Sequence, residues 1–117
     1  MHLTYRKLKL AGACSQQLKR FRELFPDGVD VTAAACASVA KEFDWDWAAR
    51  NLLPSRLRAG YEAKRAPLWD DYQAKRTSLW ADYEMWADCE DKRALLWDDY
   101  EAKCALLFGR LAVWFVD

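Results

Sequence analysis

A unit of eleven residues recurs through the second half of the chain, and it constrains the fold more than any other feature. YEAKRAPLWDD and YQAKRTSLWAD are the first two copies; starts fall at positions 61, 72, 83, 89 and 100, and the copy at position 83 has only six residues. Eleven residues make almost three helical turns, at ~3.67 residues per turn, so each copy returns its side chains to nearly the same helix face. The sequence therefore predicts helix throughout this region.

Aromatic and aliphatic side chains of the repeat form a narrow stripe along the predicted helix, which consists of Tyr61, Leu68, Tyr72, Leu79 and Tyr83. Trp69 and Trp80 flank this stripe, about 80° to 100° away, because each residue turns the helix by ~100°. Arg65 and Arg76 each follow a Tyr by four residues and precede a Trp by four. Either guanidinium can therefore reach an aromatic ring.

Six side chains of the repeat are of the types that dominate the energetics of protein interfaces, namely Trp, Tyr and Arg. These candidate partner-binding residues are Trp69, Trp80, Trp97, Tyr72, Arg65 and Arg76. Their alternative role is internal packing against the N-terminal half. The sequence leaves both roles open.

Two irregularities interrupt the repeat. Pro67 lacks the N–H that would bond the carbonyl of Ala63, so the helix either kinks or begins afresh there, and we expect a kink. The short copy rotates the later stripe by ~120°. A bend, a reversal near Asp88, or a straight continuation with two stripes would accommodate this rotation.

The length of the repeat region raises the question of what covers its aromatic rings. A single helix over residues 55–116 would be ~93 Å long, against ~35 Å for the width of a compact domain of this size. Some rings would then have no cover from the same chain, whereas a soluble monomer usually tolerates an apolar patch of only ~300 to 600 Å². The repeat therefore favours an adhesive surface for a partner or for self-assembly.

Residues 1–54 predict a small bundle of short helices. Thr4 and Thr32 are natural N-caps, and Asp44 or Asp46 can cap a helix through WDWAARNLL. The run PDG ends the second helix and Pro54 ends the last. The aromatic run FDWDW is expected to pack in the core, with a ligand-binding role as the alternative. The expected fold is all-α: an N-terminal helical bundle over 1–54, then a long, kinked or folded-back amphipathic repeat helix over 55–117 that packs on it.

Composition supports a folded protein. The 117-residue chain is 53% hydrophobic and 31% charged, with four Gly and three Pro, which is typical of helix-rich domains. The sequence has neither a secretory leader nor an 18-residue apolar stretch, so we expect a cytoplasmic location and no membrane contact. The four cysteines lack CxxC spacing and predict free, mostly buried thiols.

The zero net charge conceals a difference between the two halves. Residues 1–60 carry ten Lys or Arg against six Asp or Glu, whereas residues 61–117 carry eight against twelve, giving +4 and −4. A half with +4 is too weakly basic to indicate nucleic-acid binding. Attraction between the halves, within one molecule or between two, accounts for the asymmetry equally well.

The sequence contains no pattern of catalytic or cofactor chemistry. Its single histidine is His2, and it has no nucleophile motif, no phosphate-binding glycine loop and no ligand cluster at metal spacing. The paired carboxylates at 70–71 and 98–99 alternate with basic residues and predict a solvated face with i,i+4 ion pairs. We expect no enzymatic activity, no cofactor and no metal.

The module GACSQQLKRFRELFPDGVDVT, followed by FDWDWAARNLL and joined to YEAKRAPLW repeats, resembles small proteins of unknown function from bacteriophage and prophage genomes. The likeness implies a virus-derived accessory protein that acts in the cytoplasm of a bacterial host. It implies no active residues.

These observations favour a non-enzymatic interaction factor that binds and inhibits a host defence complex, in the manner of an anti-CRISPR protein. The first alternative is a structural protein that self-assembles into a homo-oligomer through its repeats. The second is a binder of single-stranded nucleic acid that stacks bases on aromatic rings beside Arg, although the acidic repeat half argues against it.

Overall fold

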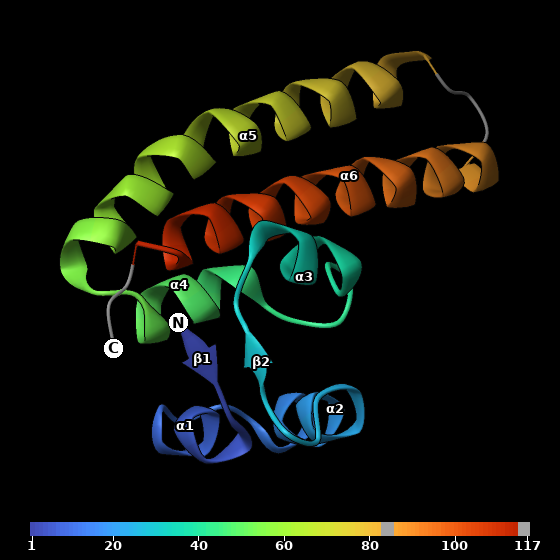
Figure 1. The fold of residues 1–117 in the computed structure, drawn as a ribbon. Helices are drawn as coiled ribbons and strands as arrows, with labels where there is room; N and C mark the ends of the chain where they lie inside the picture. The colour runs from blue at the N-terminus through green and yellow to red at the C-terminus, as the bar shows by residue number, and fades with distance from the viewer. Residues whose placement is uncertain (83–85, 115–117) are drawn as a thin grey trace.

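A computed structural model describes residues 1–82 and 86–114, with side chains described for 1–79 and 91–114. Helices make up most of it, as the sequence predicts (Figure 1). In chain order the elements are β1 (His2–Leu3), α1 (Tyr5–Leu10), α2 (Ser15–Leu24), β2 (Val29–Asp30), α3 (Ala33–Ser38), α4 (Trp45–Leu52), α5 (Ser55–Asp82) and α6 (Trp86–Ala112).

Three of the short helices begin at side chains that the sequence identifies as N-caps. The amide of Lys7 donates to Thr4 Oγ1 over 3.2 Å, and the amide of Ala35 donates to Thr32 Oγ1 over 3.1 Å. At α4 it is Asp44, and not Asp46, that accepts from the backbone, over 3.1 Å. Each cap satisfies a backbone N–H that the first helical turn leaves without a partner.

A two-stranded antiparallel ribbon, β1 with β2, is present that the sequence did not predict. His2 pairs with Asp30 and Leu3 with Val29. Gly28 makes the approach possible, because its φ is +86° and a Cβ at this position would lie 2.6 Å from the Leu3 carbonyl oxygen. The fold is mostly α-helical, as predicted, and the ribbon is a minor addition to it.

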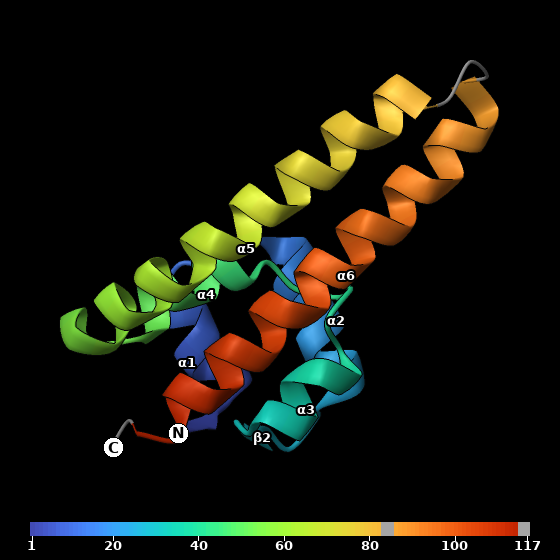
Figure 2. The same ribbon diagram turned by 90° about the horizontal axis from the view of Figure 1, so that it is seen from above.

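The repeat region folds back on itself as an antiparallel pair of helices. Helices α5 and α6 lie side by side along most of their lengths (Figures 1 and 2). The molecule measures 50 × 30 × 23 Å, so a straight rod of repeats is not formed. Pro67 lies inside α5, and the helix does not begin afresh there. Ala63 and Pro67 are both exposed, so the carbonyl that loses its helical partner at Pro67 is on the solvent side.

One hydrophobic core joins the two predicted regions. Helix α6 packs on α3 and α4, and Phe108 on α6 lies with its ring centroid 5.7 Å from that of Trp45 on α4. Trp45 is 7% exposed, and its Nε1–H donates to the carbonyl of Ala40 over 2.9 Å. The prediction that the aromatic run FDWDW supplies core packing is confirmed for Trp45.

Helices α1 and α2 form a separate layer, joined to the rest of the molecule by the β1–β2 ribbon (Figure 1). Aromatic contacts connect this layer to α4, since Phe21 on α2 lies 6.3 Å from Phe43, and Phe43 lies 6.3 Å from Trp45. None of the described helices combines the length and the apolar character that crossing a bilayer requires.

Candidate interaction groove

Four aromatic rings from two copies of the pentapeptide LWDDY, at 68–72 and 96–100, meet between α5 and α6. Across the helices, Trp69 lies 5.4 Å from Tyr100 and Tyr72 lies 5.5 Å from Trp97. Within each helix, the Trp and the Tyr are 5.5 Å apart on α5 and 5.4 Å apart on α6. The matching distances show that the two copies pair almost symmetrically. We call these four residues the ring cluster.

Burial divides the ring cluster into an inner and an outer pair. Tyr72 and Tyr100 are 8% and 6% exposed, whereas Trp69 and Trp97 are 36% and 41% exposed. The packing of α5 against α6 thus covers Tyr72, which belongs to the predicted stripe, and Tyr100. The indoles remain at the edge of the hairpin, where they are available to another molecule.

Arg65 connects the ring cluster to α4. Its Nη1 donates to the hydroxyl of Tyr100 over 3.2 Å, and its Nε lies 3.7 Å from Asp46 Oδ1. The same Asp46 oxygen accepts from the Tyr61 hydroxyl over 2.9 Å. The guanidinium therefore binds a phenol oxygen and a carboxylate. Burial raises the pKa of Tyr100 to about 12 even though the Arg65 hydrogen bond acts in the opposite direction.

The other candidate residues are less closely associated with this cluster. Arg76 is half-buried on α5 and has no hydrogen bond or ion pair in the described part of the chain. The side chain of Trp80 lies outside the described residues. The structure thus brings together Trp69, Tyr72, Trp97 and Arg65, but not Arg76.

The predicted ion pairs of the repeat are present where their side chains are described. Lys75 and Asp71 on α5, and Lys103 and Asp99 on α6, each have an N–O distance of 2.9 Å. Asp88 and Lys92 have the same i,i+4 spacing, but the side chain of Asp88 lies outside the described residues. Pairs of this kind stabilise a solvated helix face by only ~0.2 to 0.5 kcal/mol each.

An open groove of about 450 Å³ lies beside Trp97, between α6 and the segment 41–46 that precedes and begins α4. We call it the acidic groove. Residues from three parts of the chain line it, namely Gln17, Lys41, Glu42, Phe43, Asp44, Trp45, Asp46, Trp97, Tyr100, Glu101 and Cys104. Its charged lining consists of four carboxylates and one lysine, which gives a formal charge of −3.

The charges of the acidic groove are only partly balanced. Arg20 binds Glu42 through two hydrogen bonds of 2.7 and 3.0 Å, and Lys41 lies 3.1 Å from Asp98. Asp44 and Glu101 form no ion pair in the described part of the chain. A cation bound in the groove would form an ion pair with these two carboxylates.

The excess of negative charge affects the pKa of Glu101. Burial raises its pKa, and the neighbouring carboxylates of Asp98 and Asp44 raise it further, while a hydrogen bond from Trp97 and the charge of Lys41 lower it. Its carboxylate is thus close to the indole of a half-exposed tryptophan. An indole beside a carboxylate is a suitable site for an Arg or Lys side chain.

Sequence reasoning identified Trp97 but missed Glu101 and the groove role of Asp44. Glu101 has the same place in its copy as Glu62 and Glu90 in theirs, so the repeat pattern does not distinguish it. Asp44 was recognised only as a helix cap. Only the packing of α6 against the segment 41–46 brings these residues together.

Among the residues whose side chains are described, no group of three or more His, Cys, Asp or Glu could hold a metal ion. His2 lies away from the groove, beside the ribbon, where its Nδ1 is 2.7 Å from Asp30 Oδ1.

No protein-family model, curated protein or solved structure matches this chain.

Proposed function

We propose that the protein is a non-enzymatic interaction factor, and that its acidic groove accepts a basic segment of a protein partner. The observation that supports this most is the half-exposed indole of Trp97 close to the carboxylate of Glu101, in a groove that Asp44 also lines. Trp and acidic side chains together recognise Arg and Lys. The indole face attracts the cation while the carboxylates accept its N–H donors.

The affinity of the groove for a basic segment depends on how far water is excluded from it. A cation over an indole contributes ~0.5 to 1 kcal/mol at an exposed site and ~2 kcal/mol when water is excluded. A segment that covers Trp97 excludes water from the groove and also relieves the repulsion around Glu101. The carboxylates of Asp44 and Glu101, which form no ion pair in the described part of the chain, steer a basic partner toward the groove, at a rate that falls as salt increases.

A titration with tetra-arginine tests the groove directly. We expect the Trp97 indole N–H and the amides of residues 41–46 and 98–101 to shift in ¹H–¹⁵N NMR spectra, and tetra-glutamate to leave them unchanged. Trp97→Ala and Glu101→Gln should each weaken the effect about tenfold, a loss of ~1.4 kcal/mol. Trp114→Ala is the matched control, because Trp114 is 70% exposed but lies outside the groove. If Trp97→Ala and Trp114→Ala bound tetra-arginine equally tightly, the groove would not be the binding site.

The resemblance to phage and prophage proteins supports a more specific proposal, in which the partner belongs to a host defence complex and is inhibited on binding. The expected result of a pull-down from a bacterial host is one protein that wild type and Trp114→Ala recover and Trp97→Ala does not. Addition of the pure protein should then block the activity of the recovered complex. Recovery that is the same for all three forms would contradict it.

Self-association is a second candidate, favoured by the near-symmetric pairing of the two LWDDY segments. Because α5 and α6 present the same rings to each other, α6 of one molecule could pair with α5 of another at low cost, as in domain swapping. Light scattering over a wide range of protein concentration would reveal dimers. A strict monomer at every concentration would exclude this candidate.

Nucleic-acid binding is not proposed, because the exposed indole of Trp97 lies in a groove lined by carboxylates, which repel the phosphates of a nucleic acid.

A further inference from the structure

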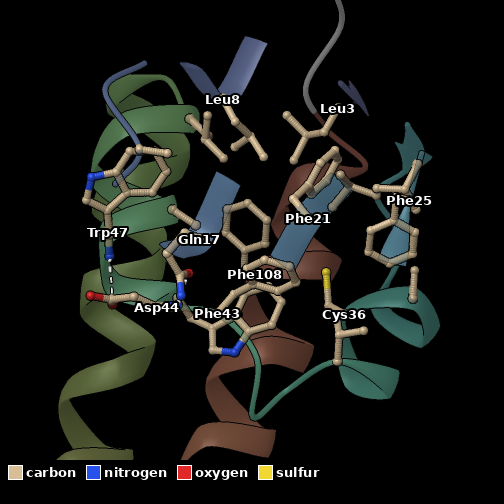
Figure 3. A pocket seen from close by; sticks show the side chains of 18 of the residues that line it. Leu3, Leu8, Gln17, Phe21, Phe25, Cys36, Phe43, Asp44, Trp47 and Phe108 are labelled. Carbon is tan, nitrogen blue, oxygen red and sulfur yellow. Dashed lines mark hydrogen bonds between the residues drawn. The ribbon is translucent and has the colours of Figure 1, made fainter. Parts of the chain in front are cut away.

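A second cavity, of about 210 Å³, lies inside the N-terminal half, between the layer of α1 and α2 and the helices α3 and α4 (Figure 3). Its lining comes from β1, α1, α2, β2, α3, α4 and one residue of α6. This cavity is separate from the ring cluster, although it shares Gln17, Phe43, Asp44 and Trp45 with the lining of the acidic groove.

The walls of the cavity are predominantly apolar and include six aromatic rings, from Phe21, Phe25, Phe43, Trp45, Trp47 and Phe108. Several rings support one another: Phe21 and Phe43 meet edge to face at 62°, and Phe43 and Trp45 do so at 79°. Such contacts hold rings in fixed orientations. The cavity is thus a shaped apolar space.

Small residues explain why this space is not filled by the protein itself. Gly12, Ala13, Ala35 and Ala48 all line it. Gly12 cannot readily be replaced by a larger residue, because its φ is +92° at the end of α1. The short side chains among the rings therefore leave the space open.

One end of the cavity is polar and reaches the surface. Gln17 and Asp44 lie on the same side of the lining as Trp47 (Figure 3), and Asp44 is exposed. Gln17 Oε1 accepts from the amide of Asp44 and Gln17 Nε2 donates to the carbonyl of Glu42, both over 3.2 Å. Asp44 Oδ1 accepts from the amide of Trp47. In the described part of the chain, Asp44 Oδ2 has no hydrogen bond or ion pair.

The buried thiol in the wall adds no charge. Cys36 is buried, and burial raises its pKa to about 12, so the thiol is neutral at physiological pH. The charged group available to a ligand in this cavity is therefore the carboxylate of Asp44. The negative charge of Asp44 makes this end of the cavity unfavourable for an anion.

We propose that this cavity binds a small aromatic molecule that carries an amino group, with the ring among the aromatic walls and the ammonium at Asp44. A cavity of ~150 Å³ lined by Leu, Ile and Phe holds benzene. The space here is larger, so it suits a substituted benzene or a bicyclic ring. Ligand sites of this type combine a mainly apolar lining with a few placed polar groups.

Three probes that share one ring system test the proposal: tryptamine with an ammonium, indole with no side group, and indole-3-acetate with a carboxylate. Each is titrated into the full chain and followed by ¹H–¹⁵N NMR. We expect tryptamine to shift the amides of residues 35–36 and 43–48. We also expect it to bind at least tenfold more tightly than indole-3-acetate, with indole between the two.

Matched variants separate the cavity from other surfaces. Ala35→Leu fills the cavity and should weaken tryptamine binding at least tenfold, whereas Ala34→Leu, on the exposed side of the same helix, should leave it unchanged. Asp44→Asn keeps an acceptor for the Trp47 amide but removes the charge, so tryptamine should then bind no more tightly than indole. Trp97→Ala in the acidic groove should have no effect.

Each contrary result overturns the proposal. The proposal is wrong if no probe shifts any amide, or if indole-3-acetate binds as tightly as tryptamine or more tightly. It is also wrong if Ala35→Leu keeps its fold and binds tryptamine as wild type does, or if Trp97→Ala loses tryptamine binding. If Ala35→Leu does not fold, the ranking of the three probes and the Asp44→Asn result decide. Because Asp44 also lines the acidic groove, Asp44→Asn should weaken tetra-arginine binding as well, whereas Ala35→Leu should leave it unchanged.

Discussion

Arg65 of α5 donates a hydrogen bond to the hydroxyl of Tyr100 on α6, with 3.2 Å between Nη1 and the phenol oxygen. Tyr100 is 6% exposed, so water does not readily replace this donor. Since the same guanidinium lies 3.7 Å from Asp46 on α4, one side chain links three helices. The base of the hairpin is held to the body of the molecule at this point.

A double-mutant cycle tests this link. Arg65→Met and Tyr100→Phe should each lower the free energy of unfolding by ~1 to 2 kcal/mol, because a hydrogen bond to a charged group is lost. Their coupling energy should be ~1 kcal/mol in urea denaturation. Arg76→Met is the control, since Arg76 has the same place in the next copy of the repeat but no such bond in the described part of the chain; it should change stability by less than ~0.5 kcal/mol. A coupling energy of zero would show that the bond does not stabilise the hairpin.

Alkaline pH should weaken the fold through its buried tyrosines. Burial raises the pKa of Tyr100 from 10.0 to about 12 and raises that of Tyr61 as well. Each raised pKa favours the folded state fully below pH ~10. For Tyr100 this contribution is lost as pH rises from ~10 to ~12, by at most ~1.4 kcal/mol per pH unit, and the loss from Tyr61 begins at the same pH. We expect Tm to fall steeply over this interval, and less steeply in Tyr100→Phe. Parallel curves for wild type and Tyr100→Phe would contradict the assignment.

Two glycines in the hairpin should respond in opposite ways to the same substitution. A Cβ at Gly109 would lie 2.6 Å from the Cα of Ala33, so Gly109→Ala must separate α6 from α3 and should cost ~2 kcal/mol. A Cβ at Gly60 would meet its nearest atom, Leu111 Cδ2, at an ordinary 3.8 Å, so Gly60→Ala should stabilise α5 by ~0.5 to 1 kcal/mol. Thermal denaturation of both variants measures these two changes in stability. Similar effects of the two substitutions would mean that α3 and α6 are not in such close contact.

The thiols should differ sharply in reactivity. Cys14 is exposed, whereas Cys36 and Cys104 are buried with raised pKa values, about 12 for Cys36. In a Cys89→Ser background at pH 8, a thiol reagent should label Cys14 within minutes. Cys36 and Cys104 should be labelled only at the rate of unfolding, because the reactive thiolate is absent and access is closed. Peptide mass mapping over time measures this, and fast labelling of Cys36 would disprove its burial.

Local signals in the sequence predicted the helix starts well. Thr4, Thr32 and Asp44 cap their helices because capping depends on a side chain and a backbone amide only three residues away. The β1–β2 ribbon was missed for the opposite reason. Its strands have two residues each, too few for alternation, and they pair across 26 or more residues of chain.

The reversal of the repeat region was one of three possibilities, and the sequence could not choose among them. No Gly, Pro or Asn follows Ala81 before Leu107 to indicate a turn. Helix α5 ends at Asp82 and α6 begins at Trp86, earlier than the suggested reversal near Asp88. The repeated LWDDY pentapeptide did carry the relevant information, because identical segments in antiparallel helices can pair with each other. The acidic groove depends on how α6 packs on the segment 41–46, which no local pattern encodes.

The antiparallel pairing of repeat copies limits how this chain can change its length. The far end of the hairpin extends beyond α3 and α4 (Figure 2). Insertion of one complete unit into both arms would move that end outward by ~16.5 Å, at 1.5 Å per residue, and leave the body of the molecule intact. Insertion into one arm alone would offset its indoles from their phenol neighbours. Viable length variants should therefore gain or lose units two at a time.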